Sequence, residues 1–305
     1  MSALEQQLVE YLTVRRALGF KLVNVELLLR QFVRYLDQLG EQRITINTAL
    51  AWAVLPGGSD SLHYGRLAAV RGFATHLRVV DPSVEIPGVE LLRNGPPRRR
   101  PFLYTEEEIL ALIDACGMFR TAHRTATYRT LIGLLASTGI RVGEAIGLDR
   151  ENLDLAVGVI VVRGKLDKLR ELPLSSSTTA ALRAYLARHD RPPSPPGERA
   201  LFVSMAGTRV AIDGVEQTFA LLRDRAGVPS RGGRRPTVHG LRHTFAIRTM
   251  LDAYRDGADA GARLGILSTY LGHVEPANTY WYLHAAPELM SAAADRLERY
   301  EEPAR

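Results

Sequence analysis

The sequence predicts a mainly helical α+β protein, in which an all-helical N-terminal domain precedes a larger helical domain with a small antiparallel sheet. Apolar residues recur at helical spacing through most of the 305 residues. One stretch, residues 153–174, has strand character instead. A segment rich in proline and arginine separates the helical pattern into two parts. We therefore expect a domain over residues 1–93, a linker over 94–101 and a second domain over 102–305.

Four helices are expected in the N-terminal domain. Ser2 and Glu5 have the spacing of a capping box, and Asn24 is placed to cap a second helix. A shorter helix is expected over 47–54, and a fourth over about 62–77. The apolar stripes of these helices contain Leu4, Leu8, Leu12, Leu28, Phe32, Leu36, Leu39, Leu62, Leu67, Val70, Phe73 and Leu77.

The second domain begins with a strong helix start. Thr105 precedes three glutamates, whose carboxylates favour the positive end of a helix dipole. A helix around 128–135 is apolar on most faces and should be central. Two strand-like runs, 159–162 and 170–174, flank a polar turn, and helices return after Ser175.

The composition limits the classes of function. No apolar run approaches the ~20 residues of a membrane span, and the N-terminus lacks the pattern of a signal peptide. Cys116 is the only cysteine, which excludes an intramolecular disulfide and a zinc site built on cysteine pairs. We therefore expect a cytoplasmic protein that does not associate with membranes.

An arginine-rich surplus gives a net charge of +6, which fits a polyanionic partner such as nucleic acid. A generally basic proteome would produce the same surplus, so charge alone does not decide between the two readings. The linker arginines Arg98, Arg99 and Arg100 either touch a DNA backbone or form a solvated hinge.

Four short motifs carry polar side chains suited to chemistry. The first has Arg141 and Glu144 three residues apart, where they share a helix face. The second has Lys165, Lys168 and Arg170 in the turn between the two strands and at the start of the second strand. Taken singly, the first motif is better explained as a surface ion pair, and the second as soluble turn lysines.

The other two motifs lie nearer the C-terminus. His239 and Arg242 place a proton-carrying group beside a fixed cation on one helix. His273 follows a glycine and precedes an aromatic cluster with Tyr280 and Tyr282. The chain has no HExxH pattern, so its histidines do not predict a metal site.

In this order the motifs resemble the catalytic signature of the tyrosine recombinase/integrase family, over residues 102–305. The N-terminal helices resemble that family's core-binding domain more loosely. The stretch 252–266 looks longer than in the smallest family members, which leaves the local path of the chain open.

Carried over from this resemblance, the catalytic residues are Arg141, Lys165, His239, Arg242, His273 and Tyr282, with Glu144 in support. The nine-residue step from His273 favours Tyr282 over Tyr280, and Lys165 rather than Lys168 directly follows the strand. Lys168 and Arg170 join the linker arginines as candidate DNA contacts.

The resemblance implies a site-specific recombinase that breaks and rejoins DNA through a 3′-phosphotyrosine link, in the movement of mobile DNA or a related rearrangement. It implies no metal and no other cofactor. The implied partners are double-stranded DNA, further copies in a tetramer on two DNA sites, and possible related recombinases. A type IB topoisomerase or a DNA-binding regulator with a recombinase-like domain is the alternative. A predicted helix over 292–300 packs either on its own domain or on a neighbouring copy.

Overall fold

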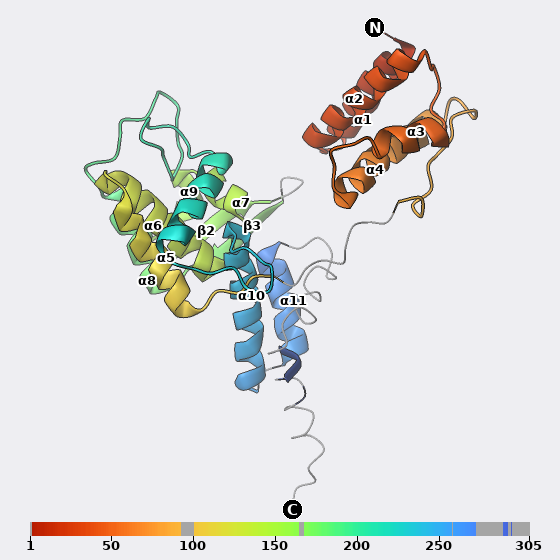
Figure 1. Ribbon diagram of the computed structural model, residues 1–305. Coiled ribbons are helices and arrows are strands. Elements are labelled where there is room, and N and C mark those ends of the chain that lie inside the picture. Colours follow the sequence, from red (N-terminus) through yellow and green to blue (C-terminus); the bar gives the residue numbers. More distant parts are fainter. Residues whose placement is uncertain are drawn as a thin grey trace, which may run out of the picture. The chain divides into compact units, whose positions relative to one another are not determined.

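The computed structural model describes residues 2–92, 101–164, 168–257, 259–272, 289–291 and 294. The chain forms two compact units, Met1–Arg99 and Arg100–Arg305 (Figure 1). Each has a hydrophobic core of its own. Within the described ranges, no helix is long and apolar enough to cross a bilayer.

The described residues of the N-terminal unit, 2–92, form four helices, as predicted. They are α1 (Ala3–Ala17), α2 (Val23–Leu39), α3 (Ile46–Ala53) and α4 (Asp60–Leu77). The hydroxyl of Ser2 accepts a hydrogen bond from the backbone N–H of Glu5, which confirms the predicted first cap. The core gathers apolar side chains from all four helices, including Leu8, Leu29, Phe32, Leu36, Ala49, Leu67, Val70 and Phe73.

Two predictions about α2 are wrong in detail. The helix begins at Val23, after a left-handed Leu22 with φ of 50°, and Asn24 lies inside the first turn. Leu22 packs on the core, so tertiary packing rather than a polar cap sets this start. Leu39 is 54% exposed because it is the last helical residue, directly before the left-handed Gly40 that ends the helix.

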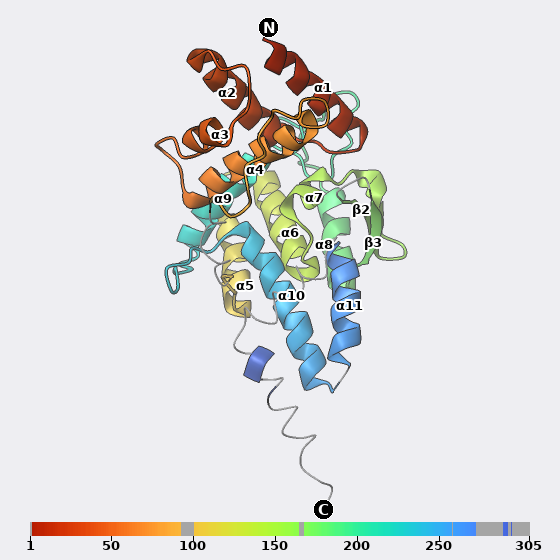
Figure 2. The ribbon, with the colours of Figure 1, turned by 90° about the vertical axis from the view of Figure 1, so that its right-hand side faces the viewer.

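The second unit is mainly helical. Its helices are α5 (Glu106–Ala115), α6 (Ala122–Thr138), α7 (Val142–Gly147), α8 (Ser176–Leu186), α9 (Ile212–Arg225), α10 (Val238–Arg255) and α11 (Ala260–Leu271), with short 3-10 turns at Cys116–Met118 and Arg150–Asn152. The predicted helix start at Thr105 is confirmed, and Thr105 and Glu108 form a capping box there. The prediction that α6 is central is confirmed, since it contacts α5, α8 and α10 (Figure 2).

A small antiparallel sheet completes the unit, as predicted, and it has three strands where two strand-like runs were expected. The strands are β1 (Leu153–Asp154), β2 (Val159–Arg163) and β3 (Leu169–Pro173), in the order β1-β2-β3. The backbone N–H of Gly164 donates to the carbonyl oxygen of Lys168 at 2.8 Å and closes the β2–β3 hairpin. Its tip, residues 165–167, lies outside the described residues.

The helices α10 and α11 lie side by side and share a small core of their own (Figure 2). Its members are Ala246, Ile247, Met250, Leu264, Leu267, Leu271 and Leu289. The stretch 252–266 therefore contains the end of α10, a short connection and the first half of α11. A left-handed Gly272, with φ of 66°, ends α11 directly before the predicted His273.

Candidate active site

The junction between α6 and α7 sets Arg141 beside α10. The helix α6 ends at Gly139, whose backbone is left-handed with φ of 60°. A Cβ atom there would lie 2.5 Å from Cδ1 of Phe245 in α10, so this close approach requires glycine. Two residues later, Arg141 is the N-cap residue of α7, and its backbone N–H donates to Oε2 of Glu144 at 3.1 Å.

The first turns of α10 present His239 and Arg242. The hydroxyl of Thr237 caps this helix by accepting from the backbone N–H of Gly240 at 3.3 Å. Arg242 is only 2% exposed and donates to the carbonyl oxygens of Gly139 at 2.8 Å and Leu271 at 2.7 Å. A buried guanidinium without partners would be costly, so these bonds fix it between the ends of α6 and α11.

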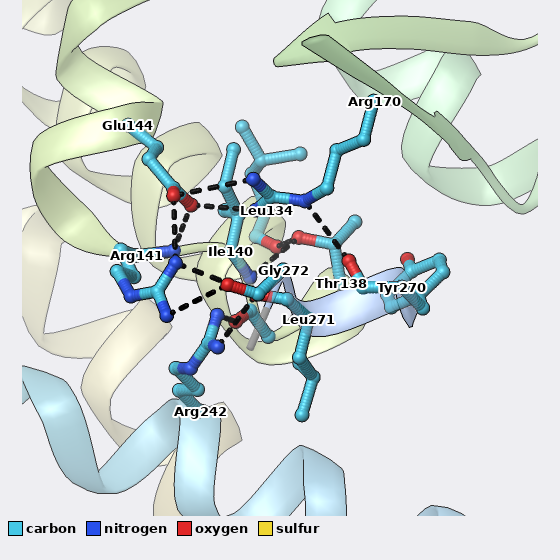
Figure 3. Close-up of polar contacts among 11 residues, drawn as sticks. Leu134, Thr138, Ile140, Arg141, Glu144, Arg170, Arg242, Tyr270, Leu271 and Gly272 are labelled. Atoms are coloured by element: carbon cyan, nitrogen blue, oxygen red, sulfur yellow. Dashed lines mark hydrogen bonds and ion pairs between the residues drawn. The ribbon is translucent and has the colours of Figure 1, made fainter. Parts of the chain in front are cut away.

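The guanidinium of Arg141 points toward the same end of α11 (Figure 3). Its Nη1 donates to Oε1 of Glu144 at 2.8 Å and to the carbonyl oxygen of Leu271 at 3.4 Å. Its Nη2 donates to the carbonyl oxygen of Gly272 at 3.3 Å. Both arginines thus converge on the carbonyl-rich C-terminus of α11, where a helix favours cations.

The carboxylate of Glu144 joins a third arginine to this group. Arg170, on β3, donates from Nη1 to Oε1 of Glu144 at 3.2 Å and from Nη2 to Oε2 at 2.7 Å. Burial alone would raise the pKa of this carboxyl, but hydrogen bonds and charges from Arg170 and Arg141 hold its pKa below the usual range. Glu144 is therefore ionised at neutral pH.

His239 is held in its neutral form. As a whole residue, His239 is exposed to solvent. Partial burial of its ring nevertheless lowers its pKa, and the charges of Arg242 and Arg141 lower that pKa further. The ring also meets that of His243 edge to face, with 4.5 Å between centroids. A neutral imidazole has one unprotonated ring nitrogen, which can accept a proton.

A family model described as the phage integrase family matches residues 103–288, more than half of the chain. The chain belongs to this family of tyrosine recombinases. The resemblance of its ordered motifs predicted this membership.

Relatives and a solved structure agree with that assignment. The recombinase is 39% identical to the putative integrase/recombinase y4rB of Sinorhizobium fredii, over 98% of each chain. It is 31% identical to the tyrosine recombinase XerC of Azotobacter vinelandii, over 75% of this chain and 71% of that one. The Tn1549 transposon integrase in complex with transposon right end DNA has the same fold, with a TM-score of 0.70 at 18% identity, over 96% and 98% of the chains.

The structure brings together four of the predicted site residues of this recombinase, namely Arg141, Glu144, His239 and Arg242. Lys168 is exposed beside the hairpin tip. The other predicted residues lie outside the described residues. They are Arg98, Arg99, Arg100, Lys165, His273, Tyr280 and Tyr282.

The side chain of Arg170, which was predicted to contact DNA, is directed into the protein. Its side chain is 13% exposed and is committed to Glu144, and its Nε donates to the carbonyl oxygen of Tyr270 at 3.0 Å. Sequence reasoning also missed the backbone carbonyls of Leu271 and Gly272, which no side-chain pattern signals. In the part of the chain that the structure describes, no group of three or more His, Cys, Asp and Glu side chains is arranged to hold a metal ion.

Proposed function

We propose that this recombinase cuts and rejoins DNA at specific sites through a 3′-phosphotyrosine link on Tyr282, in the integration or excision of mobile DNA. One observation carries the proposal. Arg141 and Arg242 converge on the end of α11, beside a neutral His239 and directly before His273 in the sequence. Tyr282 follows nine residues after His273.

The arginines serve the phosphate. Attack on a phosphodiester concentrates negative charge on the non-bridging oxygens of a five-coordinate phosphorus, and guanidinium donors stabilise that charge. Arg141 is partly open to solvent, with 30% of its side chain exposed. Arg242 converges with it on the end of α11, since both arginines donate to the carbonyl oxygen of Leu271. Loss of one such donor typically costs ~10²–10³ in rate.

Proton transfers complete the chemistry. A phenol with a reference pKa near ~10 needs an acceptor, and neutral His239 takes that role for Tyr282. The leaving 5′-oxygen takes a proton from Lys165, a general-acid role worth ~10²–10⁴ in rate. His273 positions the phosphate. The covalent link conserves the energy of the phosphodiester, so rejoining uses no nucleotide cofactor and no metal ion.

The proposed partners are double-stranded DNA and further copies of the chain. The unit before the linker acts as a clamp on the duplex, with Arg98, Arg99, Arg100 and Lys168 as backbone contacts. Four copies, with or without related recombinases, hold two DNA sites. The DNA complex of the Tn1549 integrase, which has the same fold, supports the first of these proposals.

The mapping of covalent protein–DNA junctions tests the function. The protein is incubated, in excess EDTA, with a plasmid that carries the DNA flanking its own coding sequence; a plasmid without that DNA is the control. We expect denaturant-resistant junctions at one or a few positions in the flanking DNA, together with exchanged strands. Junctions scattered over both plasmids with relaxation alone would identify a topoisomerase, and binding without any junction would identify a regulator.

A further inference from the structure

Arg170 is more buried than Arg141, the other arginine that binds Glu144. Only 13% of its side chain is exposed, against 30% for that of Arg141. In Figure 3, Arg170 approaches the carboxylate of Glu144 from a different direction than Arg141. It arrives from the hairpin strand β3, whereas Arg141 is the N-cap residue of α7. The two arginines therefore bind the same carboxylate but belong to two different elements.

The hydrogen bonds divide this carboxylate unequally. Arg170 makes the planar two-bonded pair, with Nη1 on Oε1 at 3.2 Å and Nη2 on Oε2 at 2.7 Å. Arg141 binds Oε1 through Nη1 alone at 2.8 Å, and its backbone N–H binds Oε2. Each carboxylate oxygen thus accepts two donors. The guanidinium of Arg141 therefore binds Glu144 through Nη1 alone, while its Nη2 donates to the carbonyl oxygen of Gly272 at the end of α11.

Arg170 also fits closely against that end of α11. Its Nε donates to the carbonyl oxygen of Tyr270 at 3.0 Å. A Cβ atom at Gly272 would lie 2.9 Å from Nη1 of Arg170, and the left-handed backbone there, with φ of 66°, likewise favours glycine. One side chain thus joins the hairpin that leads to Lys165, the helix capped by Arg141, and the turn that leads to His273.

We infer that Arg170 is a positioning residue: by occupying the two-bonded face of Glu144, it keeps the guanidinium of Arg141 directed at the scissile phosphate. The charge balance supports this role, because two guanidinium groups and one carboxylate leave a net charge of +1. Without Arg170 the pair of Arg141 and Glu144 is neutral, and Arg141 is free to turn and take the two-bonded position. This inference rests on the proposed function, in which Arg141 binds the phosphate.

Single-turnover cleavage of a duplex with a mapped site tests the inference. We expect Arg170→Ala to slow formation of the covalent complex by about 10–100-fold, as loss of a supporting residue typically does. Arg170→Lys keeps the positive charge but not the planar pair, so its rate should lie between those of Arg170→Ala and the wild type. Arg199→Ala is the matched control, because it removes one arginine from an exposed ion pair with Glu151.

Two readouts separate positioning from a merely structural role. A methylphosphonate at the scissile position removes the charge that Arg141 neutralises, so the defect of Arg170→Ala should shrink at least about tenfold on this substrate. The double variant Arg141→Ala/Arg170→Ala should be no slower than Arg141→Ala, since coupled residues are not additive. An equal defect on both substrates, or a multiplied defect in the double variant, overturns the inference.

DNA affinity separates positioning from direct contact. If Arg170 touches a phosphate, Arg170→Ala should weaken binding and lower the salt slope by about 1; unchanged affinity and slope support positioning. A crystal structure of Arg170→Ala, or of Arg170→Lys if the first does not fold, gives a measurement independent of cleavage. We expect the guanidinium of Arg141 to make two bonds to Glu144 in Arg170→Ala and one in Arg170→Lys, and an unmoved Arg141 in Arg170→Ala contradicts the inference. A wild-type protein that forms no covalent complex would refute the proposed function instead, while this structural result still decides the role of Arg170.

Discussion

Burial of its ring and the charges of two nearby arginines set the protonation state of His239. Partial burial, together with the charges of Arg242 and Arg141, lowers its pKa. A histidine whose pKa is lowered stays neutral at neutral pH and gains its proton only after the pH has fallen below its ordinary value of about 6.5. His239, which we propose as the base, is therefore already neutral before DNA binds.

An NMR titration of the free protein checks this state. We expect the imidazole of His239 to titrate below the ordinary value of about 6.5, and Arg141→Gln to raise its pKa because one repelling charge is gone. Arg199→Gln, which alters a distant exposed ion pair, should leave the pKa unchanged. A value at or above the ordinary one in the wild-type protein contradicts the assignment of His239 as the proton acceptor.

For Arg170, the sequence predicts the direction of the side chain but not its partner. It shares a strand face with Leu172, which is fully buried, so the two-residue period of β3 does predict an inward direction. Its partner could not be predicted in the same way, because Glu144 lies 26 residues earlier on a different element. A basic residue near a turn was therefore interpreted as a DNA contact.

At the scale of elements, α10 is fixed by the segment that enters the second unit. Tyr104 is buried, its backbone N–H donates to the hydroxyl of Thr244 at 2.9 Å, and its own hydroxyl donates to the carbonyl oxygen of Thr237 at 2.8 Å. Its ring covers Gly240, which lies between His239 and Arg242. The entry segment thus holds the turn of α10 that presents both site residues.

The variant Gly240→Ala tests this contact. The added Cβ would lie 2.8 Å from Cε2 of Tyr104 and 3.1 Å from the carbonyl oxygen of Phe102, so the helix and the entry segment must separate. We expect a loss of about 1–3 kcal/mol in the free energy of unfolding, measured by denaturant titration, and slower cleavage.

Gly265→Ala is the matched control for that variant. Gly265 also lies within a helix, but a Cβ there meets nothing within 4 Å. Alanine should therefore stabilise α11 by about 0.5–1 kcal/mol. Equal stability of the Gly240→Ala variant and the wild type would show that the entry segment yields and does not fix α10.

The start of a helix was predicted well where the residues that cap it are neighbours in sequence. The cap of Thr105 with Glu108 is of this kind, and so is that of Ser2. The start of α2 was missed because the packing of Leu22 on the core, and not a polar side chain, determines it. Such a helix start depends on contacts between residues far apart in sequence, and the periodicity of apolar residues does not reveal those contacts.

Across the whole molecule, two units with separate cores share the task of holding DNA in our account. The family resemblance predicted the convergence of the motifs, yet the bonds that achieve it join residues far apart in sequence. Arg242 reaches Gly139 over 103 residues, and Arg141 reaches Gly272 over 131. No local pattern indicates that backbone carbonyls at the end of α11 hold both arginines.

A fragment of residues 102–305 tests the division of labour between the units. Its core is complete without the N-terminal unit, so it should fold. We expect weaker DNA binding and a shallower dependence of affinity on salt than in the full chain, because fewer phosphates are contacted. Fluorescence anisotropy over a series of salt concentrations measures both. Equal affinity and slope would assign the N-terminal unit a role other than DNA binding.

Identification of the residue that becomes linked to DNA is a direct test of the role proposed for Tyr282. The covalent complex is digested with protease and nuclease, and the nucleotide-bearing peptide is sequenced by mass spectrometry. We predict that the adduct lies on Tyr282, that Tyr282→Phe binds DNA without forming it, and that Tyr280→Phe still forms it. An adduct on Tyr280 or on any other residue, or its persistence in Tyr282→Phe, would contradict the account.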